Sequence, residues 1–393
     1  MKVLTLTTLF PNRLQPISNI FVKNRVTALA RHTDLRVVAP VPWAPLDVGE
    51  YGVYRRIPSY EVQGSIEVFH PRYLVTPKVG RFLYGYMYYF SLKKFLKDMT
   101  QKDRFDILDV HWAYPDGFAG VKLAKELGIP VSLTVRGSDI NIYTRYPLRR
   151  KLIAYALRKA DLVIAVCGDM ARKVESLGVS KDKVRVIPNG VDVRRFYPME
   201  RVSARDKLGL PQDRKIILSV GRLEPPKRFD LLIRALEEMV CHDSNILLII
   251  VGEGSKRSRL ERLSRDLRVS EWVQFVGAKP NEELVYWYNA ADVFCLSSDS
   301  EGWPNVLFES LACGTPVVAS NVGGVSEVIC SEDYGILVEG NERDLWCRGI
   351  LEALNRDWDR RKLSEYARGN TWDEVGWRVY SEFRSLLQRG VGR

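Results

Sequence analysis

Two carboxylates flank what the sequence predicts to be the start of a helix. The segment Glu301-Gly-Trp-Pro-Asn-Val-Leu-Phe-Glu309 places Glu301 on a loop and Glu309 about one turn inside the helix that follows. The N–H groups at a helix start carry roughly half a positive charge in aggregate, which suits a diphosphate or sugar oxygens, and carboxylates accept hydrogen bonds from hydroxyl groups. This chemistry fits a nucleotide-sugar site, although a capped surface helix with incidental acids would have the same spacing.

A second segment places two cations directly after an expected strand. The segment Gly221-Arg222-Leu-Glu-Pro-Pro-Lys227 follows the apolar run 215–220. Glycine allows close approach of a ligand to the backbone, Arg222 can bridge two phosphate oxygens, and Lys227 adds a point charge on a flexible stem. The segment therefore predicts a phosphate site, while taken by itself it is equally compatible with a solvated loop.

Short apolar runs alternate with helical patterns along the whole chain. Strands are expected at 3–7, 35–39, 107–110, 131–135, 162–166, 184–187, 215–220, 246–251, 273–276, 293–296 and 316–319. This alternation favours parallel sheets covered by helices, so the predicted fold class is α/β with two Rossmann-like, doubly wound domains facing each other across a cleft. We expect an N-terminal domain over 1–192, a C-terminal domain over 193–372 with the polar segment 194–210 as the connection, and a helix over 373–393 that crosses back to the first domain.

Length and composition agree with two domains and exclude several classes of protein. The chain has 393 residues, of which 46% are hydrophobic and 27% charged. It contains no apolar run of the roughly 18 residues that a membrane span needs, and Met1–Phe10 enters a strand pattern without a signal-peptide pattern. The six cysteines stand singly, without metal-ligand spacing, and are expected to be reduced and buried. A cytoplasmic protein without a metal site is the resulting expectation.

The charge is distributed unevenly between the two halves of the sequence. Residues 1–190 hold 30 basic and 16 acidic side chains, a net +14, whereas 191–393 hold 29 and 32, a net −3. Such asymmetry favours an anionic partner for the first half, which could be phosphates, an acidic membrane surface or nucleic acid. The basic residues are scattered and no nucleic-acid-binding motif is present, so a nucleic-acid-binding module is the less favoured interpretation and no nucleic-acid partner is expected.

Taken together, these segments resemble the retaining family 4 glycosyltransferases of the GT-B fold, over nearly the whole chain and in the family's order. The other matching motifs are Asp109-Val-His-Trp112, Pro115-Asp-Gly117, Val186-Ile-Pro-Asn-Gly-Val-Asp192, Val251-Gly-Glu-Gly254, Val276-Gly277, Ala291-Asp-Val-Phe294, Gly314-Thr-Pro-Val-Val-Ala319 and Gly323-Gly324. Within the family, Leu9-Phe-Pro-Asn12 and Thr134-Val-Arg-Gly-Ser-Asp-Ile-Asn141 look like bacterial surface-polysaccharide transferases of the teichuronic-acid and exopolysaccharide type.

The resemblance implies a role for each matching residue. Arg222 and Lys227, with Gly221, would hold the donor diphosphate, Glu309 would accept from the ribose hydroxyls, and Glu301 would orient the donor sugar. Asn305 and Val306 would present N–H groups to the sugar and phosphates, while Glu253, Gly254 and Val276 would lie around the base. His111 would lie near the reacting carbon and bind sugar hydroxyls, although a hydrogen-bonded histidine at a strand end is the alternative.

The sequence departs from the family pattern at two places. Where relatives often have a Gly-Gly loop after the first strand, this chain has Pro16-Ile-Ser-Asn-Ile20, so Asn19 becomes a candidate on the acceptor side. Where many relatives have histidine, this chain has Arg136, which could bring a permanent cation to an acceptor phosphate. A salt bridge from Arg136 to Asp139, the other acceptor-side candidate, would be an equally good explanation.

The activity that the resemblance implies is transfer of a sugar from a nucleoside diphosphate to an acceptor alcohol with retained anomeric configuration. The resemblance also implies a metal-independent reaction, and no cofactor is expected. A sugar-nucleotide epimerase or a phosphorylase-like enzyme of the same fold, and a catalytically silent partner protein, are the alternatives.

The helix expected from about 82 to 99 suggests where the acceptor comes from. One stripe is apolar and predicted to face the core; it consists of Tyr84, Tyr88, Leu92, Phe95 and Met99. The opposite face combines rings and ammonium groups; it consists of Phe82, Tyr86, Tyr89, Lys93 and Lys97. Such a face can lie on an anionic membrane, which predicts peripheral attachment through the N-terminal domain and a lipid-linked saccharide acceptor. Coverage of the rings by the segment 58–77 is the alternative.

Overall fold

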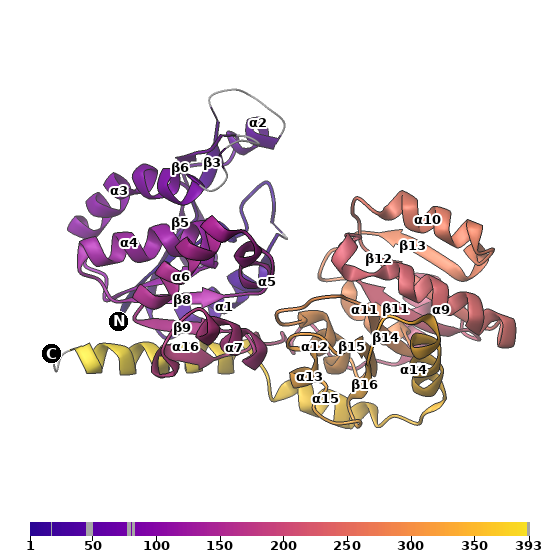
Figure 1. Ribbon diagram of the computed structural model, residues 1–393. Coiled ribbons are helices and arrows are strands. Elements are labelled where there is room, and N and C mark those ends of the chain that lie inside the picture. Colours follow the sequence, from indigo (N-terminus) through magenta and orange to yellow (C-terminus); the bar gives the residue numbers. More distant parts are fainter. Residues whose placement is uncertain (17, 45–49, 77–79, 81–82, 391–393) are drawn as a thin grey trace. The chain divides into compact units, whose positions relative to one another are not determined.

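A computed structural model describes the whole chain except residues 17, 45–49, 77–79, 81–82 and 391–393 (Figure 1). The chain divides into two compact units, of which unit 1 comprises Met1–Asn189 with Trp372–Arg393 and unit 2 comprises Gly190–Thr371. The chain therefore passes from unit 1 into unit 2 and returns to unit 1 in its last helix.

Unit 1 contains a sheet with the order β10-β9-β8-β7-β1-β2-β5-β4. Its strands are β1 (Lys2–Leu6), β2 (Asp34–Val38), β4 (Tyr60–Gln63), β5 (Ile66–Phe69), β7 (Ile107–His111), β8 (Val131–Val135), β9 (Leu162–Ala165) and β10 (Val184–Val186). All neighbours are parallel except β4, which pairs antiparallel with β5. Because β1 lies between β2 and β7, the strand order reverses there, and the carboxyl ends of β1 and β7 border the place where such sheets bind ligands.

Helices cover both faces of this sheet. They are α1 (Ile20–Ala30), α3 (Tyr84–Lys102), α4 (Phe118–Leu127), the short α5 (Ser138–Asn141), α6 (Pro147–Lys159), α7 (Gly168–Ser176) and α16 (Trp372–Gly390). On one side α4 packs between α3 and α6, and α1 packs against α16. A small parallel pair, β3 (Val41–Trp43) and β6 (Arg72–Leu74), lies beside α3, with the short helix α2 (Glu50–Tyr54) next to β3. In the described part of the chain, no helix is both long enough and apolar enough to cross a membrane.

Unit 2 contains an all-parallel sheet with the order β13-β12-β11-β14-β15-β16. Its strands are β11 (Lys215–Val220), β12 (Ile246–Val251), β13 (Val273–Gly277), β14 (Val293–Leu296), β15 (Val317–Ser320) and β16 (Gly335–Val338). Its helices are α8 (Arg201–Leu208), α9 (Phe229–His242), α10 (Arg257–Asp266), α11 (Leu284–Ala290), α12 (Asn305–Ala312), α13 (Val325–Val328), α14 (Arg343–Asn355) and α15 (Arg360–Arg368). In chain order the sheet reads 3-2-1-4-5-6, so its ligand-binding switch point lies between β11 and β14.

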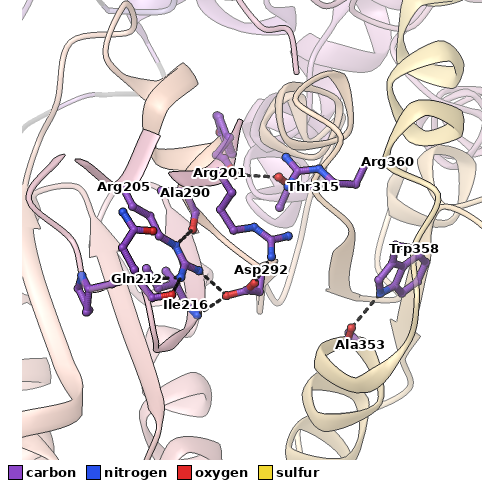
Figure 2. A network of polar contacts seen from close by, with 12 residues as sticks. Arg201, Arg205, Gln212, Ile216, Ala290, Asp292, Thr315, Ala353, Trp358 and Arg360 are labelled. Carbon is purple, nitrogen blue, oxygen red and sulfur yellow. Dashed lines mark hydrogen bonds and ion pairs between the residues drawn. The ribbon is translucent and has the colours of Figure 1, made fainter. Parts of the chain in front are cut away.

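The segment 194–210, expected only as a connection, contains the helix α8 and is part of unit 2. The Arg205 guanidinium on α8 is almost fully buried and donates to the Ala290 carbonyl oxygen at 3.0 Å and to Asp292 Oδ2 at 2.7 Å (Figure 2). The backbone N–H of Ile216 donates to the same carboxylate at 2.7 Å. Asp292 therefore joins α8 to β11 at the amino end of the strand, and Arg205 also binds the end of α11, which gives the aspartate of the Ala-Asp-Val-Phe motif a structural role.

The helix expected at 82–99 is α3, and its buried side differs from the prediction. Tyr88, Tyr89 and Leu92 are buried. Tyr89 donates a hydrogen bond to Glu126 on α4, and Lys93 forms an ion pair with the same carboxylate at 2.9 Å. The predicted aromatic and basic face was therefore wrong at Tyr89, because α4 covers this side of the helix. Phe82 lies outside the described residues.

The cysteines are free thiols, but their burial is not uniform. Cys167, Cys295, Cys313 and Cys347 are buried, as expected, whereas Cys241 and Cys330 are exposed. The expectation of six buried thiols was wrong for these two.

Candidate functional site

The candidate donor-binding residues of unit 2 gather at the carboxyl edge of its sheet. Gly221, Arg222 and Lys227 lie between β11 and α9, and Glu301 lies between β14 and α12. The remaining members lie in the loop after β12, at the end of β13 and in α12; they are Glu253, Gly254, Val276, Asn305, Val306 and Glu309. Parallel strands present all their carboxyl ends at one edge, which is why segments up to 88 residues apart in the sequence meet there.

The structure pairs the predicted phosphate-binding lysine with the predicted sugar-binding carboxylate. Lys227 Nζ lies 2.6 Å from Glu301 Oε1, and the Glu301 side chain is only 11% exposed. The loop that carries Lys227 is held to β14 by Ser297, whose hydroxyl donates to the Lys227 carbonyl oxygen at 3.0 Å. A lysine ammonium has three protons to donate, so Lys227 can keep this contact while it donates to a phosphate oxygen.

Glycines bring the loops of this edge into backbone contact. Gly252 has a φ of +148°, and a Cβ added there would lie 1.8 Å from the Gly221 carbonyl oxygen. A Cβ at Gly254 would lie 2.5 Å from the carbonyl oxygen of Leu223, whose N–H donates to the Glu253 carbonyl oxygen at 2.9 Å. The glycines of the Val-Gly-Glu-Gly motif are therefore required by packing of the loop after β12 against the loop after β11.

Arg222 and the amino end of α12 complete the positive side of the site. The Arg222 guanidinium is exposed and makes no hydrogen bond or ion pair with the residues that the structure describes. α12 begins at Asn305, so the positive end of its dipole lies at the same edge as Lys227. Together these groups offer an electrostatic environment suited to a diphosphate.

Glu309 differs from Glu301 in its surroundings. Its Oε2 accepts a hydrogen bond from the Tyr288 hydroxyl at 2.8 Å, and burial raises the pKa of the Glu309 carboxyl to about 7. Glu253 forms an ion pair with Arg257, and Val276 is partly buried at the end of β13. The assignments of these side chains to the ribose and the base stay predictions.

The predicted acceptor residues of unit 1 form a buried polar network at the carboxyl ends of β7 and β8. His111 is fully buried; Asp109 Oδ2 lies 2.8 Å from its Nε2, and Arg136 donates to its Nδ1 at 2.6 Å. Burial lowers the pKa of His111 to about 4, so the ring is neutral and carries its proton on Nε2. Both nitrogens are thus occupied, so His111 holds Arg136 and Asp109 in this structure, and its contact with sugar hydroxyls stays a prediction.

Arg136 and Asp139 do not form the salt bridge that the sequence allowed. The Arg136 guanidinium donates to Asn189 Oδ1 at 3.0 Å and lies over the Phe21 ring at 5.3 Å. The fully buried Asp139 carboxylate accepts backbone N–H groups, from Gly137 at 2.8 Å and from Ala113 at 3.0 Å. Asp139 therefore organises the loops after β7 and β8, and its assignment to the acceptor side stays a prediction.

Asn19 and Arg25 lie at the first helix of unit 1. Asn19 precedes α1 with a φ of 51°, and its side-chain amide donates to Ser18. Arg25 was not among the residues predicted for the site. It is buried, donates to the Thr134 hydroxyl at 2.7 Å and lies 3.9 Å from Asp109. The signal was present in the sequence, because Arg25 stands in the apolar stripe of Val22, Val26 and Leu29, where a cation needs a buried partner.

Comparison with known proteins decides the family. The model of glycosyltransferase family 4 matches residues 19–195, and that of the glycosyl transferases group 1 matches residues 200–370. The teichuronic acid biosynthesis glycosyltransferase TuaC of Bacillus subtilis is 31% identical over 366 residues, which cover 91% of this chain and 89% of TuaC. The chain belongs to glycosyltransferase family 4. The N-acetyl-alpha-D-glucosaminyl L-malate synthase of Bacillus anthracis is 26% identical over 76% of each chain.

Solved structures agree on the fold of this family 4 glycosyltransferase. A sucrose-phosphate synthase from Thermosynechococcus elongatus superposes with a TM-score of 0.80 at 22% identity, over 99% of this chain and 100% of that one. Anabaena HepE in complex with UDP gives a TM-score of 0.73 at 17% identity, over 98% and 100% of the two chains. The fold is GT-B, with two Rossmann-like units, as the sequence predicted.

Proposed function

We propose that this glycosyltransferase moves a sugar from a nucleoside diphosphate sugar to a saccharide hydroxyl with retention of the anomeric configuration. The observation that carries the proposal is the meeting of Lys227, Glu301 and the exposed Arg222 at the switch point of unit 2. The complex of HepE with UDP supports a nucleoside diphosphate as part of the donor. The similarity to TuaC, whose name refers to teichuronic acid biosynthesis, supports an acceptor in bacterial surface-polysaccharide synthesis. We propose that this acceptor is a lipid-linked saccharide at the cytoplasmic side of the membrane.

The proposed chemistry is electrostatic. As the bond between the anomeric carbon and the diphosphate oxygen breaks, negative charge grows on the leaving group, where Arg222, Lys227 and the amino end of α12 stabilise it. The acceptor oxygen forms the new bond on the same face, and its proton passes to an oxygen of the departing phosphate. Glu301 orients the sugar and Glu309 the ribose. No metal or cofactor takes part in the proposed reaction.

Removal of either cation tests the donor site. We expect Arg222→Ala and Lys227→Ala each to lower turnover by about 10²-fold, the usual cost of losing one donor that stabilises transition-state charge, and to weaken donor binding. The measurement is release of nucleoside diphosphate in buffer with EDTA. Arg262→Ala is the matched control, since Arg262 is an exposed cation of unit 2 on α10. Near-normal turnover of both site variants would contradict the assignment.

The donor and the stereochemistry need separate measurements. A thermal-shift panel that starts with UDP-sugars should reveal the donor, because a ligand at 100 times its Kd stabilises by about 2.7 kcal/mol. The anomeric configuration of the product then tests retention, and an inverted product would overturn it. An epimerase would convert the nucleotide sugar without transfer to the acceptor, and a phosphorylase would require phosphate.

A further inference from the structure

Two neighbouring helices of unit 1 expose apolar side chains on one side. On α3, Tyr86 is 41% and Phe90 70% exposed; on α6, Leu148 is 55% and Tyr155 37% exposed. The rings of Tyr86 and Tyr155 both pack against the buried Phe118 of α4, with centroids 4.9 Å and 5.9 Å from its ring. Aromatic packing thus joins the exposed sides of α3 and α6 into one surface across α4.

Cations share this surface. Lys94 follows Phe90 by one turn, and Lys151 lies between Leu148 and Tyr155 at helical spacing, and both lysines are exposed. Residues 141–160 contain six basic side chains and no acidic one; the six are Arg145, Arg149, Arg150, Lys151, Arg158 and Lys159. Among the residues that the structure describes, none of these six forms an ion pair. We call Tyr86, Phe90, Lys94, Leu148, Lys151 and Tyr155 the α3–α6 face.

The α3–α6 face lies beside the predicted acceptor loops. The loop after β7, which follows His111, contacts the start of α3 through the Tyr114 hydroxyl, which accepts from the Gly85 N–H at 2.9 Å. A Cβ on Gly85 would lie 2.8 Å from both Tyr114 and Phe118, so this contact is close. α6 in turn follows the loop after β8, which carries Arg136, and packs against the same loop after β7.

We propose that the α3–α6 face binds an anionic lipid surface and thereby brings a lipid-linked acceptor to the carboxyl edge of the unit 1 sheet. The acceptor part rests on the proposed function. Rings and Leu148 enter the headgroup region, while the lysines keep their ammonium groups at the lipid phosphates. An anionic polymer in water would satisfy the cations but would leave Phe90 and Leu148 without apolar contact. The surface differs from the one predicted from sequence, since Phe90 and α6 replace Tyr89 and Lys93.

Vesicle sedimentation tests the proposal. The full chain should bind vesicles of equal parts phosphatidylglycerol and phosphatidylcholine, more weakly at high salt, and should not bind phosphatidylcholine alone. A basic residue near such a surface contributes about fivefold, so Lys94→Glu with Lys151→Glu should bind at least about 30-fold more weakly. Phe90→Ser with Leu148→Ser should also weaken binding, because these side chains enter the lipid.

The matched control reverses two exposed cations of unit 2 on α10, Arg262→Glu with Arg265→Glu, and should bind like the unaltered chain. Equal losses in the control and the face variant, or binding that ignores lipid charge, would overturn the proposal. Transfer to a water-soluble saccharide without vesicles separates it from the proposed function. Intact transfer without vesicle binding overturns only the membrane face, whereas vesicle binding without any transfer overturns only the proposed function.

Discussion

At the scale of single residues, burial shifts the pKa values of His111 and Glu309 in opposite directions. His111 is held neutral because burial opposes its charge, and its two neighbours fix which nitrogen carries the proton. Glu309 is shifted the other way, because the same loss of solvent opposes the carboxylate and raises its pKa to about 7. A group that titrates near neutral pH in a ligand site makes binding depend on pH.

Glu309 should therefore make nucleotide binding depend on pH. Hydroxyl groups of a ribose donate to the carboxylate form, so binding at pH 7 should release about half a proton per nucleotide, and affinity for the nucleoside diphosphate should rise about tenfold from pH 6 to pH 8. Calorimetric titration in buffers of different ionisation enthalpy measures the proton. Glu309→Gln should remove both effects and weaken binding at pH 8. Equal proton release by the unaltered chain and Glu309→Gln would refute the ribose role.

At the scale of elements, a glycine holds the loop that carries Glu301. A Cβ at Gly323, where φ is +57°, would lie 2.0 Å from the Glu301 carbonyl oxygen. Gly209 has a similar φ of +64° but no atom within 4 Å of such a Cβ. Gly209→Ala should therefore cost only the strain of the left-handed conformation, about 1–2 kcal/mol. Gly323→Ala should lower the free energy of unfolding by about 1–3 kcal/mol more than Gly209→Ala does, which denaturant unfolding measures. It should also weaken donor binding, which nucleotide titration measures. Equal losses of unfolding free energy in the two variants would show that the close contact of Gly323 with Glu301 does not matter for stability.

The sequence best predicted the helices and strands whose positions follow from a local pattern of apolar residues. The bounds of β8, β11, β12 and β14 match the expected ranges, because strands buried on both faces read as continuous apolar runs. The hairpin β4–β5 and helix α8 were missed. β4 is an edge strand with partly exposed side chains, and α8 is anchored by the buried ion pair of Arg205 rather than by an apolar stripe.

The residues of the candidate site can also be divided into those whose position local patterns predict and those whose contacts they do not. The place of Gly221, Arg222 and Lys227 directly after a strand could be predicted, since it follows from the apolar run that precedes them. The contact of Gly252 with Gly221 depends on β12 being placed next to β11, and the burial of Arg25 depends on Asp109 in a strand 84 residues away. Such contacts follow from sheet order, which local patterns do not contain.

At the scale of the whole molecule, the last helix belongs to the unit that the chain left at residue 189. Val375, Val379 and Phe383 of α16 are buried in the core of unit 1, together with Val22, Val26 and Leu29 of α1. A Cβ at Gly376 would lie 2.7 Å from the backbone of Ala28, so the two helices approach closely. Arg185 on β10 also binds Glu382 at 3.1 Å. Stability of the first unit therefore depends on residues that are synthesised after the second.

This dependence predicts that a change in the last helix destabilises unit 1 and leaves unit 2 intact. Phe383→Ala should cost about 3–5 kcal/mol, the usual price of emptying a fully buried aromatic site, and lower the melting temperature of unit 1 by several degrees. Scanning calorimetry with and without nucleoside diphosphate distinguishes the units, because the ligand should raise only the transition of unit 2. Arg384→Ala, at an exposed neighbouring position, should leave both transitions unchanged. If Phe383→Ala instead lowers the nucleotide-sensitive transition, the helix stabilises unit 2, and the division of the chain given above is wrong.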